Sequence, residues 1–159
     1  MATPIENPTE EETASWHRTM ASRAFNRTWE LLDRNELTRV EQEQMLAVTF
    51  AQRHHWYQVG TARNHAIADW QVSRVAAVLG YADLARRFGE ISLETAIEND
   101  LDPFVIGFAH EAIARAAADV DDVETFTEHL EAARALLADI EDDEDRELLA
   151  ADLAEMSVE

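Results

Sequence analysis

The chain has 159 residues, no cysteine, only four glycines and three prolines, and a formal net charge of −20. This composition excludes disulfides and thiolate metal sites, and it argues against a Gly-rich phosphate loop and the turn-dense all-β folds. The negative charge repels nucleic acids and anionic membranes, so we expect neither as a partner.

The acidic charge is concentrated in the second half of the chain. Residues 1–80 carry a net charge of −2 and residues 81–159 carry −18, while every basic residue is Arg. One interpretation is a docking face for a basic partner. The other is an acidic, salt-tolerant or high-GC proteome that places Asp, Glu and Arg at solvated positions.

The sequence also carries expectations about the cellular compartment. The first residues hold neither the basic nor the apolar segment of a signal peptide, and no stretch reaches the roughly 20 apolar residues of a membrane span. We therefore expect a soluble, cytoplasmic protein in which residues 1–8 form a disordered tail.

Two capping boxes mark the first predicted helices. Thr9 with Glu12 begins a helix that we expect to end near residue 35, and Thr38 with Glu41 begins one that ends near Gly60. Apolar residues recur along the first at helical spacing. Together the two helices predict a divergent hairpin at 9–60.

Five further helices are predicted. Four lie at about 62–79, 81–100, 103–118 and 123–140, and that at 103–118 is apolar on nearly every side, which is typical of a central position. A last helix at 143–157 has one thin apolar stripe, as a capping helix does. Short connections favour antiparallel hairpins. We predict one all-α domain, 9–159, of about seven helices.

The two central hairpins repeat at an offset of 40 residues when Gly80 is set against Val120. Small residues then recur seven positions apart on one helix face, as in the pairs Ala85 with Ser92 and Thr125 with Ala132. This pattern resembles the tetratricopeptide repeat, across about residues 70–140. The period is longer than is usual in that family, only one copy has the turn glycine, and neither has the closing proline.

The resemblance implies a right-handed array of helical hairpins, at 62–100 and 103–140, with a concave groove that binds a peptide or protein segment. Residues 53–79 are also similar to a segment of small bacterial helical proteins of this type, which implies no particular activity. The residues shared there are His55-Trp56, Val59-Gly60, Asn64, Trp70-Gln71 and Ser73-Arg74.

First helices line the groove in the tetratricopeptide family, so the resemblance nominates ligand-binding residues on those helices. They are Arg63, Asn64, Trp70, Arg74, Phe108 and Arg115. Arg74 and Arg115 lie at near-equivalent positions of the two copies, a pair suited to clamping a carboxylate. Trp56 and Trp70 are either an aromatic clamp beside Arg74 or ordinary core residues.

A second hypothesis is a metal or small-ligand site on the hairpin at Gly60. His55 and His65 each lie five residues from this glycine, and Asp69 lies one turn after His65. Two imidazoles and a carboxylate that converge suit Zn²⁺ or Fe²⁺ with an open position for water. The alternative is structural, with a His65–Asp69 ion pair and a packed His55.

Other residues carry weaker expectations. We expect His110 in the core, His129 at its boundary, and Gly89 and Gly107 where helices approach closely. No nucleophile elbow and no Glu-x-x-His motif occur. We therefore predict a non-enzymatic interaction module without a cofactor. A metal-dependent bundle and a ligand-free homodimer are the alternatives.

Overall fold

The computed structural model describes residues 7–156, which contain seven α-helices, one short 3₁₀ helix and no strand. The prediction of an all-α fold built from about seven helices is confirmed. The helices are α1 (Glu10–Leu32), α2 (Arg39–Val59), α3 (Ala62–Val78), α4 (Ala82–Glu98), α5 (Pro103–Ala118), α6 (Val123–Leu136), the 3₁₀ helix η1 (Leu137–Asp139) and α7 (Asp143–Ala154).

Side-chain caps fix where most of these helices begin. The capping boxes predicted at Thr9 and Thr38 are both present, because each threonine accepts from the backbone N–H three residues on and the glutamate there accepts in return. Thr61 forms a third such box, which begins α3. Aspartate side chains cap α5, α6 and α7.

Two helix ends differ from the prediction. The first helix ends at Leu32 rather than near residue 35, and the exposed residues that follow lead into α2. The sixth ends at Leu136 and tightens into η1, which brings Ile140 into the core at 4% exposure. Residues 1–6 of the predicted tail and residue 157 of the predicted last helix lie outside the described part of the chain.

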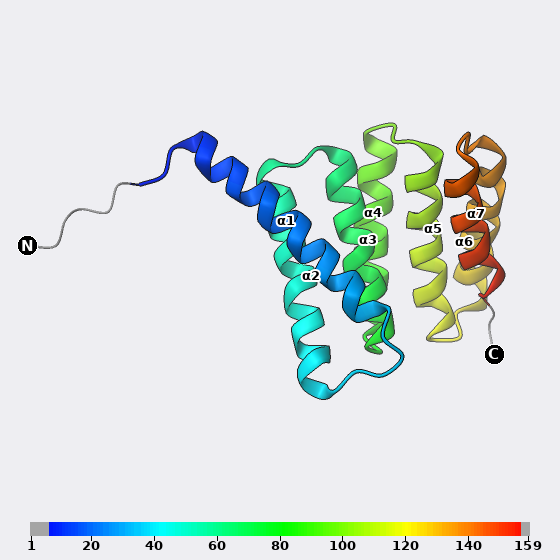
Figure 1. The fold of residues 1–159 in the computed structure, drawn as a ribbon. Helices are drawn as coiled ribbons and strands as arrows, with labels where there is room; N and C mark the ends of the chain where they lie inside the picture. Colours follow the sequence, from blue (N-terminus) through cyan, green and yellow to red (C-terminus); the bar gives the residue numbers. More distant parts are fainter. Residues whose placement is uncertain (1–6, 157–159) are drawn as a thin grey trace, which may run out of the picture.

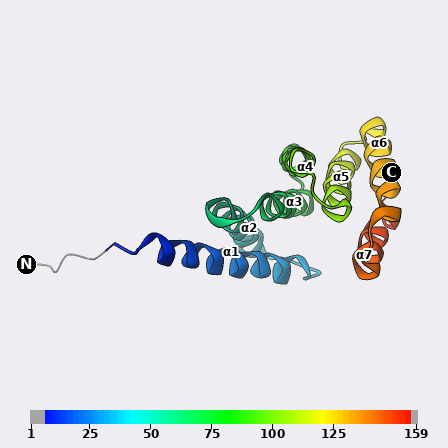
Figure 2. The ribbon, with the colours of Figure 1, turned by 90° about the horizontal axis from the view of Figure 1, so that it is seen from above.

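The helices pack as consecutive antiparallel hairpins, α1 with α2, α3 with α4 and α5 with α6, and α7 follows (Figure 1). Seen from above, they follow an arc (Figure 2). Helices α1 and α7 form its two flanks, α3 and α5 lie between them, and α4 and α6 lie on the outer side. The inner face is therefore built from the first helices of the hairpins together with α7.

The two central hairpins repeat at an offset of 41 residues, so the predicted offset of 40 is wrong. The helix caps Thr61 and Asp102 correspond, as do the left-handed turn residues Gly80 and Asp121, with φ of 79° and 55°. The backbone N–H that follows each turn residue bonds the last helical turn in the same way. Asp tolerates the left-handed conformation, so the second turn does not require the glycine that the first turn has.

Close helix packing explains two glycines, as predicted. A Cβ at Gly89 would lie 3.1 Å from Ile113 of α5, and one at Gly107 would lie 2.5 Å from the Leu149 side chain of α7. Leu149 is fully buried in the cluster that joins α5, α6 and α7. Gly107 therefore lets α7 lie against α5 and close one side of the inner face.

No helix in the described range is long and apolar enough to cross a membrane.

Candidate functional site

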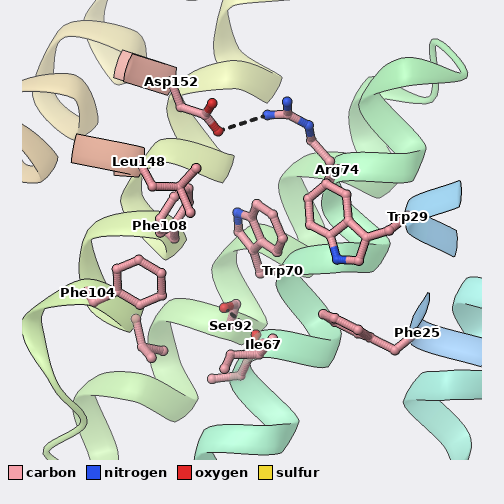
Figure 3. Close-up of a pocket in the computed structure, with 12 residues that line it drawn as sticks. Phe25, Trp29, Ile67, Trp70, Arg74, Ser92, Phe104, Phe108, Leu148 and Asp152 are labelled. Carbon is pink, nitrogen blue, oxygen red and sulfur yellow. Dashed lines mark hydrogen bonds and ion pairs between the residues drawn. The ribbon is translucent and has the colours of Figure 1, made fainter. Parts of the chain in front are cut away.

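The inner face contains a cavity of about 270 Å³ between α1, α3, α5 and α7 (Figure 3). Its residues follow helical spacing: one turn separates Phe25 from Trp29 on α1, and Phe104 from Phe108 on α5. The lining consists of Phe25, Trp29, Ala66, Ile67, Trp70, Arg74, Ser92, Phe104, Val105, Phe108, Leu148 and Asp152. Most of these side chains are apolar, and several are aromatic.

Trp70 is the centre of the aromatic wall. Its ring centroid lies 5.7 Å from that of Trp29 and 5.3 Å from that of Phe108, which meets it edge-on at 75°. Phe104 in turn meets Phe108 edge-on at 4.9 Å. Aromatic pairs at such distances and angles stabilise one another beyond their burial alone. The wall is thus assembled from three helices far apart in the sequence.

A buried carboxylate organises the polar edge of the cavity. The side chain of Glu111 is fully buried, and its Oε2 accepts the indole N–H of Trp70 at 3.1 Å. Its Oε1 pairs with the guanidinium groups of Arg74, at 3.5 Å, and Arg115. Asp152 of α7 lies 3.4 Å from Arg74 and 3.8 Å from Arg115. Two carboxylates of the chain therefore face two guanidinium groups.

This network changes the role that the sequence suggested for the two arginines. Burial and then the positive charge of Arg74 lower the pKa of Arg115 to about 10. Glu111 and Asp152 already supply the carboxylates that Arg74 and Arg115 would clamp. A buried pair of this kind needs all its members, because removal of one leaves another charge uncompensated. The predicted carboxylate clamp is therefore occupied by the chain itself.

The nominated groove residues divide into two groups. Trp70, Arg74 and Phe108 line the cavity, and Arg115 joins its edge through Glu111.

Arg63 and Asn64 do not line the cavity. Arg63 pairs with Asp102 at 3.0 Å on the surface, and the amide oxygen of Asn64 accepts the Thr61 backbone N–H at 3.0 Å in the α3 capping box.

The partner of Trp70 in the aromatic wall is Trp29, whereas Trp56 is not among the cavity residues. The sequence paired Trp56 with Trp70 because the two lie close along the chain, but Trp56 lies on the far side of the α2–α3 turn. Trp29 instead reaches Trp70 because α1 lies along the inner side of the arc (Figure 2), and Figure 3 shows the two rings beside each other.

The structure does not bring together the predicted metal ligands His55, His65 and Asp69. The fully buried Asp69 side chain accepts hydrogen bonds from the Tyr57 hydroxyl and from Arg53. Burial raises the pKa of Asp69 despite these bonds, and burial together with the bond to Asp69 raises the pKa of Tyr57 to about 12. These are the contacts of a structural ion pair.

His65 has a packing role. Its Nε2 lies 3.1 Å from the carbonyl oxygen of Trp56, and its ring stacks on Tyr57 with centroids 4.2 Å apart. The surface ion pair between His65 and Asp69 that the sequence offered as the structural alternative is not formed, because the buried Asp69 pairs with Arg53 instead. Equal distance from Gly60 therefore did not place His65 beside His55, because His65 contacts Trp56 and Tyr57 instead.

His55 instead contacts two other histidines. Its Nδ1 lies 2.8 Å from the Nδ1 of His17 on α1, and His54 lies beside both. Within residues 7–156, these three are the one set of His, Cys, Asp or Glu side chains with ligand atoms grouped for a metal, all within 4.8 Å of one another. Burial, followed by the charges of His17 and His54, lowers the pKa of His55.

A second histidine pair lies on α5 and α6. The Nδ1 atoms of His110 and His129 are also 2.8 Å apart. Burial lowers the pKa of both, and that of His110 falls to about 4. Both rings are half-buried, so His129 fits its predicted boundary position and His110 lies nearer the surface than predicted.

Sequence reasoning missed several residues of the site, namely Phe25, Trp29, Glu111, Leu148 and Asp152. One had a usable signal: Glu111 is the single acidic residue inside the apolar stretch 103–118, and an acid at such a position needs a partner when buried. The others look in sequence like ordinary members of a helical apolar stripe or an acidic face.

Comparison of the chain with models of known protein families, with curated proteins and with solved structures finds no match.

Proposed function

We propose that this is a non-enzymatic, cytoplasmic, tetratricopeptide-like interaction module whose inner groove holds a peptide segment of a partner protein. The segment would insert a bulky apolar or aromatic side chain into the cavity and carry basic residues beside it. The observation that supports this proposal is the aromatic-lined cavity on the inner face, bounded by α1, α3, α5 and α7.

The size of the cavity suits an inserted side chain. Its volume of about 270 Å³ is slightly below the range of about 300–1,000 Å³ that is usual for small-molecule sites. The neighbouring rings of Trp29 and Trp70, tilted by 36° to each other, offer broad apolar faces, and Leu148 is 54% exposed at the α7 side. Aromatic pockets of this type provide the anchor points of peptide and protein interfaces.

Charge complementarity favours a basic partner. Helix α7, one flank of the groove, has Asp143, Glu144 and Asp145 in its first turn, and the half of the chain that contains it carries a net charge of −18. Such a surface attracts cations and accelerates the encounter with a basic segment. Arg74 and Arg115, already paired with Glu111 and Asp152, offset little of this charge at the groove.

A displayed library of random peptides, selected against the wild-type protein, tests the proposal. We expect selected peptides to combine an aromatic or large aliphatic residue with Lys or Arg. Leu148→Gln removes apolar surface at the cavity and should weaken the selected peptides about tenfold. Ile97→Gln is the matched control, because Ile97 is similarly exposed at 55% but lies on α4 outside the cavity.

Two results would contradict the groove proposal. One is a selection that yields no saturable binder, or peptides without a large apolar residue. The other is equal loss of binding in Leu148→Gln and Ile97→Gln, measured by calorimetry with a synthetic copy of one selected peptide. Added salt should weaken binding if basic residues contribute as proposed.

A further inference from the structure

The three histidines on α1 and α2 lie apart from the groove and take no part in the proposed peptide binding. His17 belongs to the N-terminal half of α1, and His54 and His55 belong to the last turns of α2. Two adjacent residues of a helix point about 100° apart, yet both rings lie beside His17, at centroid distances of 6.1 and 5.0 Å. Helix α1 crosses α2 (Figure 1), and the ring of His17 on α1 thereby meets both rings of α2.

We propose that His17, His54 and His55 form a binding site for a divalent transition-metal ion of the Zn²⁺ type, with water as a fourth ligand. Neutral imidazole is the ligand that Zn²⁺, Ni²⁺ and Cu²⁺ prefer among nitrogen and oxygen donors. Three imidazoles with an open fourth position are an established arrangement for Zn²⁺ in proteins.

The distances suit such an ion. Zn–N bonds of about 2.0–2.1 Å in a tetrahedral site hold ligand nitrogens about 3.3 Å apart. The Nδ1 atoms of His17 and His55 are 2.8 Å apart, and one nitrogen of each of the three rings lies within 4.8 Å of the others. The required separation falls between these values, so modest rotations of the side chains are sufficient.

A cation can take the place of the hydrogen bond between His17 and His55. Two Nδ1 atoms 2.8 Å apart form a hydrogen bond only when one of them carries the proton and the other does not. A metal ion satisfies both lone pairs at once and also engages His54, whose ring lies 5.2 Å from that of His55. His54 is exposed, so an ion has access from solvent.

The neighbouring Trp16 supplies a spectroscopic reporter. Its ring meets those of His17 and His55 edge-on, both at 5.1 Å, and the residue is 53% exposed. Binding would join α1 to α2 near the N-terminal end of the array. An ion that binds only the folded chain also raises its melting temperature.

The His110–His129 pair is the matched control within the same molecule. Its Nδ1 atoms have the same 2.8 Å separation, and it also joins two neighbouring helices. It lacks a third grouped ligand within residues 7–156. His129→Gln should therefore leave metal binding unchanged, whereas His17→Gln, His54→Gln and His55→Gln should each weaken it at least about tenfold.

The experiment uses the full chain without an affinity tag, stripped with chelator and then titrated with Zn²⁺ by calorimetry. Excess Mg²⁺ is added so that it, rather than Zn²⁺, occupies the many surface carboxylates, because Mg²⁺ prefers oxygen ligands. We expect one Zn²⁺ per chain and a higher melting temperature. Cu²⁺ should quench the fluorescence of Trp16, and bound Co²⁺ should show the visible absorption typical of a four-coordinate site. Binding should decline as pH falls and the imidazoles are protonated.

The proposal is overturned if no saturable Zn²⁺ binding occurs, or if His54→Gln binds as tightly as the wild type. It is also overturned if His129→Gln loses binding to the same extent. Because His54 is exposed, its substitution does not endanger the fold, and circular dichroism checks each variant. The peptide selection is independent of this titration, so either proposal can fail alone.

Discussion

The two central hairpins share one backbone plan but differ at the positions that build the site. At the offset of 41 residues, Arg74 corresponds to Arg115, and Trp70 corresponds to Glu111. The corresponding tryptophan and glutamate bond to each other, and both arginines pair with the same glutamate. Divergence at one position of a repeat has thus produced a contact between the repeats.

The same comparison explains where the cavity lies. Ala66 of α3 lines the cavity, whereas the corresponding Gly107 of α5 lies beneath Leu149 of α7. Helix α7 therefore covers the inner face of the second hairpin and leaves part of the first hairpin open. The recess forms at the edge of that cover, between α7 and α1.

On the opposite side, the two hairpins are attached differently. Asp69 and Phe88 of the first correspond to His110 and His129 of the second. Asp69 accepts from Arg53 of α2, and this guanidinium also lies over Phe88, whereas His110 bonds to His129 within its own hairpin. The first hairpin is thus linked to α2 and the second is not linked in this way.

The largest expected effect is the loss of the glutamate that joins the two hairpins. Glu111→Ala leaves the Trp70 indole N–H without its acceptor and leaves two guanidinium groups with Asp152 alone, which should lower the free energy of unfolding by about 3–5 kcal/mol. Glu111→Gln should cost less, because an amide oxygen still accepts from Trp70. Urea unfolding measures both, and Glu131→Ala, at an exposed site on α6, is the control. Equal costs at 111 and 131 would show that the network is not stabilising.

The corresponding arginines should differ in their contribution. Their side chains are almost equally exposed, 23% for Arg74 and 25% for Arg115, but Arg115 lies one turn from Glu111 on the same helix, whereas Arg74 reaches it from α3. We expect Arg115→Ala to lower the free energy of unfolding by about 2–3 kcal/mol and Arg74→Ala by about 1 kcal/mol. A double-mutant cycle of each with Glu111→Ala isolates the pairwise contribution. A stronger coupling for Arg74 would reverse this ranking.

The histidine pair makes the second hairpin sensitive to acid. The pKa of His110 is lowered to about 4 in the folded protein, so between that value and about 6.5 the unfolded chain binds a proton that the folded chain does not. Stability should therefore fall as pH decreases through this range, by about 1–2 kcal/mol after allowance for the solvent that reaches the half-buried ring. Unfolding of wild type and His110→Gln across pH 7 to 4 measures the difference, and parallel curves would contradict the assignment.

The smallest expected effects concern the two corresponding turns. Gly80 has a φ of 79°, so Gly80→Ala should cost about 1 kcal/mol, although no atom lies within 4 Å of the added Cβ. Asp121 adopts the same left-handed region at 55°, so Asp121→Gly should be stabilising by up to about 1 kcal/mol. Thermal melts of the two variants should shift in opposite directions. Shifts of the same sign would mean that local contacts outweigh backbone conformation.

The sequence determined the helical class, most helix boundaries and the close packing at two glycines, because these depend on local signals. Capping boxes, the periodicity of apolar residues and the cost of glycine inside a helix act over only a few residues. Trp70 and Phe108, which the sequence nominated as groove residues, both lie on the inner face. They lie on corresponding first helices, whose placement follows from the order of the hairpins.

Only the tertiary structure decided which side chains meet. Trp29 reaches Trp70 because α1 folds across the inner face, and Asp152 reaches both arginines because α7 packs against Gly107. The pairing of His55 with His17 rather than His65 likewise depends on the crossing of α1 and α2. Such contacts depend on the positions of whole helices, which a pattern within one helix does not encode.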